Sequence, residues 1–99
     1  MLVCEISDAK LDFEAYFVID STVLGRCCGG VRMRPEVTMD ETRELAKSMT
    51  LKYGFLEIPL GGAKLGICVN NFPSGTRRKQ IFVRIGKSLE PLIMRGCFY

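Results

Sequence analysis

The stretch IPLGGAKLGI, residues 58–67, places Lys64 in a glycine-rich segment between apolar residues. A lysine after glycines is typical of phosphate binding, but the phosphate loop has the spacing G-x-x-x-x-G-K-[ST], with a hydroxyl for magnesium. Here Ala63 precedes the lysine and Leu65 follows it. The dinucleotide fingerprint G-x-G-x-x-G also fails, because these glycines have another spacing and precede a predicted strand. Both phosphate sites are therefore excluded, and Lys64 remains as an ammonium group in a turn that glycines can make tight.

Lys52 is a second candidate cation, twelve residues before Lys64. At about 100° per residue on a predicted helix, it shares an apolar stripe with Leu45, Met49 and Leu56. We therefore expect Lys52 on the buried face, where an ammonium group needs an anion such as a substrate carboxylate. The alternative is a lysine at the edge of the stripe, whose stem lies on apolar surface while its head reaches water.

A second glycine pair, Gly29-Gly30, precedes Arg32 in a predicted strand. Glycine inside a strand marks a place where another backbone or a ligand approaches closely. Two ammonium groups that converge on a glycine-lined cleft would bind a carboxylate together with a reacting group. The sequence therefore predicts a small-molecule site built from Lys52, Lys64 and the two glycine pairs.

The composition excludes several other classes of site. There is no histidine, so Ser-His and Cys-His catalysis are excluded within this chain, as are most zinc sites. The five cysteines form no C-x-x-C pair, which favours free thiols in a reducing cytoplasm and no metal. No segment approaches the roughly 20 apolar residues of a membrane span, and the start lacks the pattern of a signal peptide.

The net charge of +3 is small and its basic residues are scattered, so nucleic acid is not favoured as a partner. An RNA-binding function would rest only on the run Arg77-Arg78-Lys79, which is typical of a solvated helix face. We therefore expect neither a nucleic-acid nor a membrane partner.

The elements that must position these lysines follow from periodicity. Alternation over residues 12–21 predicts a strand, and residues 27–33 and 63–69 are predicted as two more. Residues 2–6 fit a short helix or a strand equally well. Strands that alternate with helices predict an α/β fold, a three-layer α/β/α domain with a small, mostly parallel or mixed sheet.

Two helices are predicted between and after these strands. The first spans residues 39–56 and begins with a capping box, in which Thr38 accepts from the amide of Glu41 and the glutamate reaches back. The second begins after Ser74, follows a turn at residues 70–73, and is kinked or ended by Pro91. Its apolar stripe consists of Ile81, Phe82, Ile85, Leu89 and Leu92.

Residues 25–67 resemble the substrate-binding signature of the glutamate/leucine/phenylalanine/valine dehydrogenases. Three parts occur in the family's order: Gly-Gly-x-Arg-Met at residues 29–33, Met-Thr-x-Lys at residues 49–52, and Pro-x-Gly-Gly-Ala-Lys-x-Gly at residues 59–66. The combination is much more specific than any single part. The resemblance implies the N-terminal, substrate-binding and dimerisation domain of this family.

The resemblance also implies an activity, the NAD- or NADP-dependent oxidative deamination of an L-amino acid to a 2-oxo acid. Lys64 resembles the catalytic lysine, which activates the water that attacks the imino acid. Lys52 resembles the lysine that binds the α-carboxylate, and Gly29 and Gly30 resemble the lining of the same pocket. Arg32 also stands at a family position, where we expect a structural role. A homodimer or a higher homo-oligomer is implied as the assembly.

Two departures from the family pattern bear on function. Cys28 stands where glutamate-specific members carry a lysine for the substrate's side-chain carboxylate, which favours an apolar or unusual substrate. The family's catalytic aspartate and Rossmann domain would follow Tyr99, so residues 1–99 are expected to be one truncated domain that binds no cofactor and is inactive alone. The alternative is a non-catalytic binding or assembly module that keeps the fold, against which the presence of both lysines argues.

Overall fold

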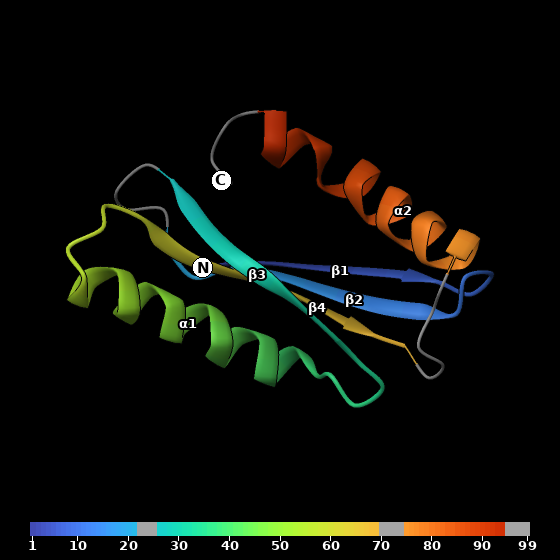
Figure 1. The fold of residues 1–99 in the computed structure, drawn as a ribbon, viewed down its shortest axis with the longest axis horizontal. Coiled ribbons are helices and arrows are strands. Elements are labelled where there is room, and N and C mark those ends of the chain that lie inside the picture. The colour runs from blue at the N-terminus through green and yellow to red at the C-terminus, as the bar shows by residue number, and fades with distance from the viewer. Residues whose placement is uncertain (22–25, 70–74, 95–99) are drawn as a thin grey trace.

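The computed structural model describes residues 1–21, 26–69 and 75–94, the last three by their backbone alone. Two helices lie on opposite sides of one sheet (Figure 1). The elements in chain order are β1 (Leu2–Asp8), β2 (Phe13–Ile19), β3 (Cys27–Arg34), α1 (Met39–Phe55), β4 (Gly61–Cys68) and α2 (Gly75–Met94). This three-layer α/β/α arrangement confirms the predicted fold class. The ambiguous N-terminal segment is a strand.

The sheet is mixed, with the strand order β1-β2-β4-β3. β1 and β2 form an antiparallel hairpin, and β2 is also antiparallel to β4. β3 and β4 are parallel and joined through α1, so these three elements form a βαβ unit. The register pairs Gly30 with Lys64 and Cys28 with Gly62. The glycine pair of β3 therefore lies beside the predicted catalytic lysine.

The hydrophobic core lies between the sheet and α2. Phe17 and Ile67 from the central strands are fully buried there with Ile81 of the helix. The predicted stripe on α2 is confirmed at Ile81, Ile85 and Leu89, whereas Phe82 is exposed and has the guanidinium of Arg78 over its ring, 5.8 Å from the centroid. Other members of this core are Ile6, Phe13, Ala15, Ile19, Cys27, Ala63, Leu65 and Val69.

The other face of the sheet is covered by α1 through small residues. A Cβ on Gly62 would lie 2.1 Å from the carbonyl oxygen of Ala46, and a Cβ on Gly66 would lie 2.3 Å from Oγ1 of Thr42. The helix can approach β4 this closely only because these two strand positions are glycines. Thr42 and Ala46 are accordingly the buried residues of α1.

The predicted apolar stripe of α1 is therefore only partly correct. Ala46, expected at its margin, is fully buried, while Leu45, Met49 and Tyr53 are half-buried and Leu56 is 52% exposed. The large apolar residues lie to one side of the line of contact, because the closest approach is made by small residues against glycine.

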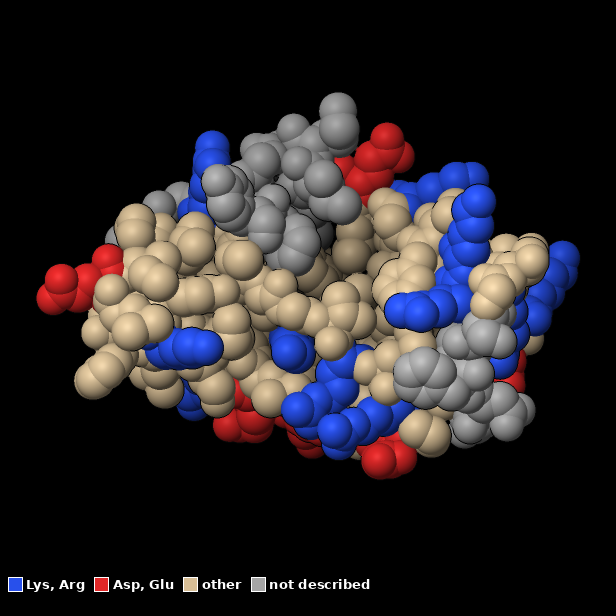
Figure 2. Space-filling model, in the orientation of Figure 1, with Lys and Arg blue, Asp and Glu red and all other residues tan. Residues whose placement is uncertain are grey.

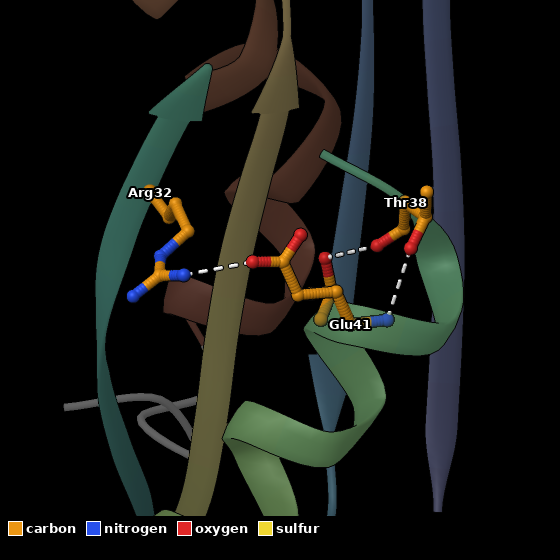
Figure 3. A network of polar contacts seen from close by, with 4 residues as sticks. Arg32, Thr38 and Glu41 are labelled. Atoms are coloured by element: carbon orange, nitrogen blue, oxygen red, sulfur yellow. Dashed lines mark hydrogen bonds and ion pairs between the residues drawn. The ribbon is translucent and has the colours of Figure 1, made fainter. Parts of the chain in front are cut away.

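The start of α1 is capped as predicted, but its glutamate has another role. Thr38 Oγ1 accepts from the amide of Glu41 at 3.1 Å. The carboxylate of Glu41 does not return to the cap. It accepts from Arg32 of β3 at 2.7 Å (Figure 3). This ion pair ties the first turn of the helix to the edge strand, which is the structural role expected for Arg32.

Pro91 lies inside α2, and the helix continues to Met94. Of the two predicted effects of this proline, a kink or an end of the helix, the end is therefore wrong. The predicted turn at residues 70–73, the Ser74 cap and the side chain of Leu92 lie outside the described residues. Neither α1 nor α2, as described, is long and apolar enough to cross a membrane.

Candidate functional site

Lys64 lies in β4 on the face of the sheet that α1 covers. Side chains alternate along a strand, so Lys64 shares this face with Gly62 and Gly66, which both contact the helix. Because α1 lies directly over these glycines, the lysine side chain extends sideways toward β3. Its Nζ lies 3.3 Å from the position that a Cβ of Gly30 would occupy. The ammonium group is therefore held over Gly30, half-buried between helix and edge strand.

The ammonium of Lys64 is not neutralised by the described residues. Glu41, the acidic residue of α1 that faces β3, is paired with Arg32. Among the described side chains, neither Lys64 nor Lys52 forms an ion pair. A half-buried cation without a counter-ion attracts an anion from solution, because desolvation weakens the screening of its charge.

Gly29 has a different role from Gly30. A Cβ at Gly29 would lie 1.6 Å from the carbonyl oxygen of Ala63 in the neighbouring strand. Only glycine permits this close approach of β3 to β4, and the approach brings Gly30 beside Lys64. Gly29 therefore allows the two strands to come close, and Gly30 leaves the space next to the Lys64 ammonium free of a side chain.

Lys52 is exposed, so the prediction that it lies on the buried face of α1 is wrong, and its exposure agrees with the alternative of a lysine at the edge of the stripe. The buried direction is set by Thr42 and Ala46 against the glycines of β4, and Lys52 lies to one side of it. The side chain belongs to the flank of the helix that overlooks β3. Lys52 comes eleven residues after Glu41, which at about 100° per residue is three turns plus about 20°. Glu41 reaches β3, so this flank faces that strand.

The same geometry gives the level of Lys52 along the sheet. Eleven residues of helix rise about 16 Å, which equals about five residues of strand. Because α1 runs back from the end of β3 to its start, Lys52 lies level with the beginning of β3, near Cys28. By this estimate Lys52 lies level with the first residues of β3, including Cys28, while Gly30 and Lys64 are paired in the middle of the β3–β4 ladder.

Tyr53 belongs to this group and was not singled out from the sequence as a site residue. Its side chain is half-buried and lies beside Cys28. Burial raises the pKa of the Tyr53 phenol above its ordinary value, and the neighbouring Cys28 thiol raises it further. This part of the site therefore contains a phenol next to a thiol. Its position in the stripe of α1, one residue after Lys52, is the signal that could have identified it.

Thr50 is a second residue of this region that was not singled out from the sequence as a site residue. Its Oγ1 accepts from the backbone N–H of Gly62 at 2.8 Å and lies 3.4 Å from the carbonyl oxygen of Ala46. The hydroxyl thus joins the C-terminal half of α1 to the start of β4.

Among the charged side chains on the face that Figure 2 shows, Lys and Arg predominate, although uncharged residues cover most of the surface. Lys and Arg side chains lie across its middle and one side, while acidic side chains lie mainly at the margins (Figure 2). β3 crosses the middle of this view (Figure 1). Such a distribution favours the approach of an anion to the region around β3.

A hollow in the described part of the chain lies elsewhere. Its volume is about 360 Å³, it lies at the β1–β2 turn, and neither candidate lysine lines it. Its polar residues are Ser7, Asp8, Asp12, Glu14 and Cys68. We place the site at the lysines, because an acidic hollow would repel a carboxylate. The described residues contain no group of three His, Cys, Asp or Glu side chains arranged for a metal ion.

The Tyr16 phenol, on β2, makes the stability of the domain depend on pH. Tyr16 donates to the Glu14 carboxylate at 2.8 Å, and this bond, together with burial, raises the pKa of Tyr16 to about 12. The protonated phenol stabilises the fold fully below its unfolded pKa of 10, and this stabilisation is lost as the pH rises through about 12. We expect the stability advantage of the parent chain over Tyr16→Phe to shrink by about 1–2 kcal/mol between pH 9 and 12. Urea unfolding of both chains at several pH values measures this, and an advantage independent of pH would contradict it.

Both the sequence and the fold of this chain are similar to those of known proteins. Residues 3–94 match the family described as Glu/Leu/Phe/Val dehydrogenase, dimerisation domain. The NAD-specific glutamate dehydrogenase of Peptoniphilus asaccharolyticus is 45% identical over 58 residues, which are 59% of this chain and 14% of that protein. The NADP(+)-dependent glutamate dehydrogenase of Pyrobaculum calidifontis is 37% identical over 82 residues, 82% of this chain and 20% of that protein. The chain therefore spans a small part of the relatives it matches.

Solved structures show the same likeness. The hetero-hexameric glutamate dehydrogenase of Thermus thermophilus, in its Leu-bound form, has a TM-score of 0.73 at 30% identity over 89% of this chain and 22% of that one. The L-tryptophan dehydrogenase of Nostoc punctiforme has a TM-score of 0.78 at 22% identity, covering 100% of this chain and 29% of that one. The second likeness is one of fold alone.

Proposed function

The chain belongs to the Glu/Leu/Phe/Val dehydrogenase family, whose dimerisation domain it matches, and from this premise we propose that it supplies the substrate-binding lysines of an L-amino-acid dehydrogenase. The observation that carries the proposal is the ammonium group of Lys64 over Gly30, without a counter-ion among the described residues. The substrates would be an L-amino acid and its 2-oxo acid. Both contain a carboxylate next to the reacting carbon.

Each lysine has a distinct role in this proposal. Lys52, exposed on the flank of α1 above β3, binds the α-carboxylate as a mobile cation. Lys64, held over Gly30, contacts the reacting carbon, where its ammonium stabilises negative charge on oxygen and its amine accepts a proton from the attacking water. The exposed backbone of Gly30 leaves room for the substrate.

We propose no site for the nicotinamide cofactor in this chain. The sequence contains no G-x-G-x-x-G, and its glycine-rich segment enters strand β4 instead of a helix N-terminus. We therefore propose that NAD or NADP is bound by a region that the relatives contain outside the part matched here, and that these 99 residues do not transfer hydride by themselves. Incubation with L-amino acids and either cofactor should yield no NADH or NADPH, and measurable turnover would refute this.

Cys28 points to a substrate with a neutral side chain. It is half-buried, lies beside Tyr53, and comes two residues before Gly30, which is about 7 Å along the strand. This end of the site therefore contains a thiol and a phenol. Both can contact an apolar or weakly polar substrate side chain without burying an unpaired charge. A second carboxylate, as in glutamate, would find no cation at Cys28.

This specificity is testable by exchanging the charge. We expect the parent chain to bind 2-oxobutyrate more tightly than 2-oxoglutarate, and Cys28→Lys to reverse the order by improving 2-oxoglutarate about tenfold. Isothermal titration calorimetry with both acids measures the two affinities. Cys4→Lys, a half-buried thiol on β1 far along the sheet order, is the matched control and should leave the ratio unchanged. An unchanged ratio in Cys28→Lys would contradict the proposed specificity.

A homo-oligomer is the assembly that we propose. The matched domain is described as a dimerisation domain, and the Thermus thermophilus relative is a hetero-hexamer. Phe55 and Leu51, at the end of α1, are 89% and 68% exposed and would be shielded by an interface. The alternative function, an assembly module without chemistry, shares these apolar residues. It predicts no binding of 2-oxobutyrate, so the same calorimetry separates the two.

A further inference from the structure

Thr50 forms the only side-chain hydrogen bond between α1 and β4 in the described part of the chain. The N–H of Gly62 donates to its Oγ1 at 2.8 Å, whereas the Gly62 carbonyl accepts from Asp20 of the segment after β2. The β2–β4 register ends at the pair Ile19 and Ala63. The hydroxyl of Thr50 thus provides the acceptor for an amide at the very end of the strand ladder.

The helix and strand are in contact at the same point. A Cβ on Gly62 would lie 2.1 Å from the Ala46 carbonyl oxygen and 2.4 Å from the Thr50 nitrogen. The backbone of α1 therefore packs directly on the backbone of β4. The hydrogen bond between Thr50 and Gly62 then prevents α1 from sliding along the strand. A contact without side chains in between transmits any change in one element to the other.

The position of this joint relative to the two lysines is specific. Thr50 comes two residues before Lys52, and Gly62 comes two residues before Lys64. We propose that Thr50 is a positioning residue, whose bond to Gly62 sets the placement of Lys52 relative to Lys64 and hence the geometry with which both cations meet one 2-oxo acid. The proposal rests on the proposed function for its substrate, although the placement itself does not depend on it.

A purely structural threonine exists on the same helix for comparison. Thr42 is buried, 1% exposed, and faces Gly66 as Thr50 faces Gly62. Its hydroxyl donates within the N-terminal turn, to the Thr38 carbonyl at 2.8 Å, and forms no recorded bond to the strand. Removing either hydroxyl with valine keeps the branched shape. Only the change at Thr50 removes a bond between the two lysine-bearing elements.

The test uses Thr50→Val, Thr50→Ser and Thr42→Val, with ¹³C-lysine NMR and titration by 2-oxobutyrate. In Thr50→Val we expect the Cε signals of Lys52 and Lys64 to move and the affinity to fall about fivefold. Thr50→Ser keeps the hydroxyl and should retain the parent signals and affinity. Thr42→Val should match the parent at both lysines, whatever its effect on stability.

Parent-like lysine signals and affinity in Thr50→Val would overturn the proposal. If that variant does not fold, exchange of the Gly62 amide in the parent chain decides: protection supports the bond, and exchange as fast as in an exposed loop overturns it. If the parent binds no 2-oxobutyrate, the proposed function fails. The placement of the lysines is then judged separately, from their signals in Thr50→Val and from the Gly62 exchange.

Discussion

Replacing Gly62 by alanine should destabilise the domain by about 3 kcal/mol or more, because the added methyl group meets helix backbone. The nearest atoms, the Ala46 oxygen at 2.1 Å and the Thr50 nitrogen at 2.4 Å, cannot move without moving α1. A small domain is stable by only about 5–15 kcal/mol, so this is a large fraction of the total. Urea unfolding followed by circular dichroism measures the change.

Gly54→Ala is the matched control for this prediction. Gly54 lies in the same helix, is exposed, and has nothing within 4 Å of the position of a Cβ. Alanine there should stabilise the chain by up to about 1 kcal/mol, because glycine is a poor helix former. Equal stability of Gly62→Ala and the parent would show that α1 does not lie directly on β4.

Replacing Lys64 by glutamine should weaken 2-oxobutyrate binding about 10- to 100-fold with little change in stability. A hydrogen bond to a charged group contributes about 1.5–3 kcal/mol, and glutamine keeps a donor but removes the charge. Stability should change little, because no described residue forms an ion pair with Lys64. Calorimetric titration gives the affinity, and urea unfolding gives the stability of the same sample.

Lys47→Gln is the control for charge alone. Lys47 is exposed on α1 and lies outside the site, so its replacement lowers the net charge equally without touching the proposed contacts. Its affinity for 2-oxobutyrate should stay within about twofold of the parent. A similar loss in both variants would mean that the acid is attracted by the overall positive charge of this face and is not bound at Lys64.

Much of the fold follows from local patterns. The alternation over β2 predicted a strand because Ala15, Phe17 and Ile19 lie in the core between sheet and α2. The first helix was predicted with its correct first residue, because Thr38 caps it as threonine does in many helices. Its predicted last residue was one position too far along the chain. β1 could not be assigned because it is an edge strand in which only Ile6 is buried, so burial leaves little periodicity.

The site could be predicted in its residue types but not in its geometry. The burial of α1 was inferred from its large apolar residues, but the contact with β4 is made by Thr42 and Ala46 against glycines. A helical wheel uses only the sequence of the helix, so it could not show that glycines of β4 would draw the small residues of α1 into contact. For this reason Lys52 was assigned to the wrong face. Gly62 was identified as part of a turn, whereas it lies within β4, where lack of a side chain serves packing.

The central claim is that Lys52 and Lys64 act together on one carboxylate-bearing substrate. ¹³C-lysine NMR of the parent chain during titration with 2-oxobutyrate tests it most directly. We predict that the Cε signals of these two lysines shift along one saturable curve with a single dissociation constant, while the exposed Lys10 and Lys47 do not follow it. Shifts that are equal at all lysines, or absent at Lys64, would contradict the account.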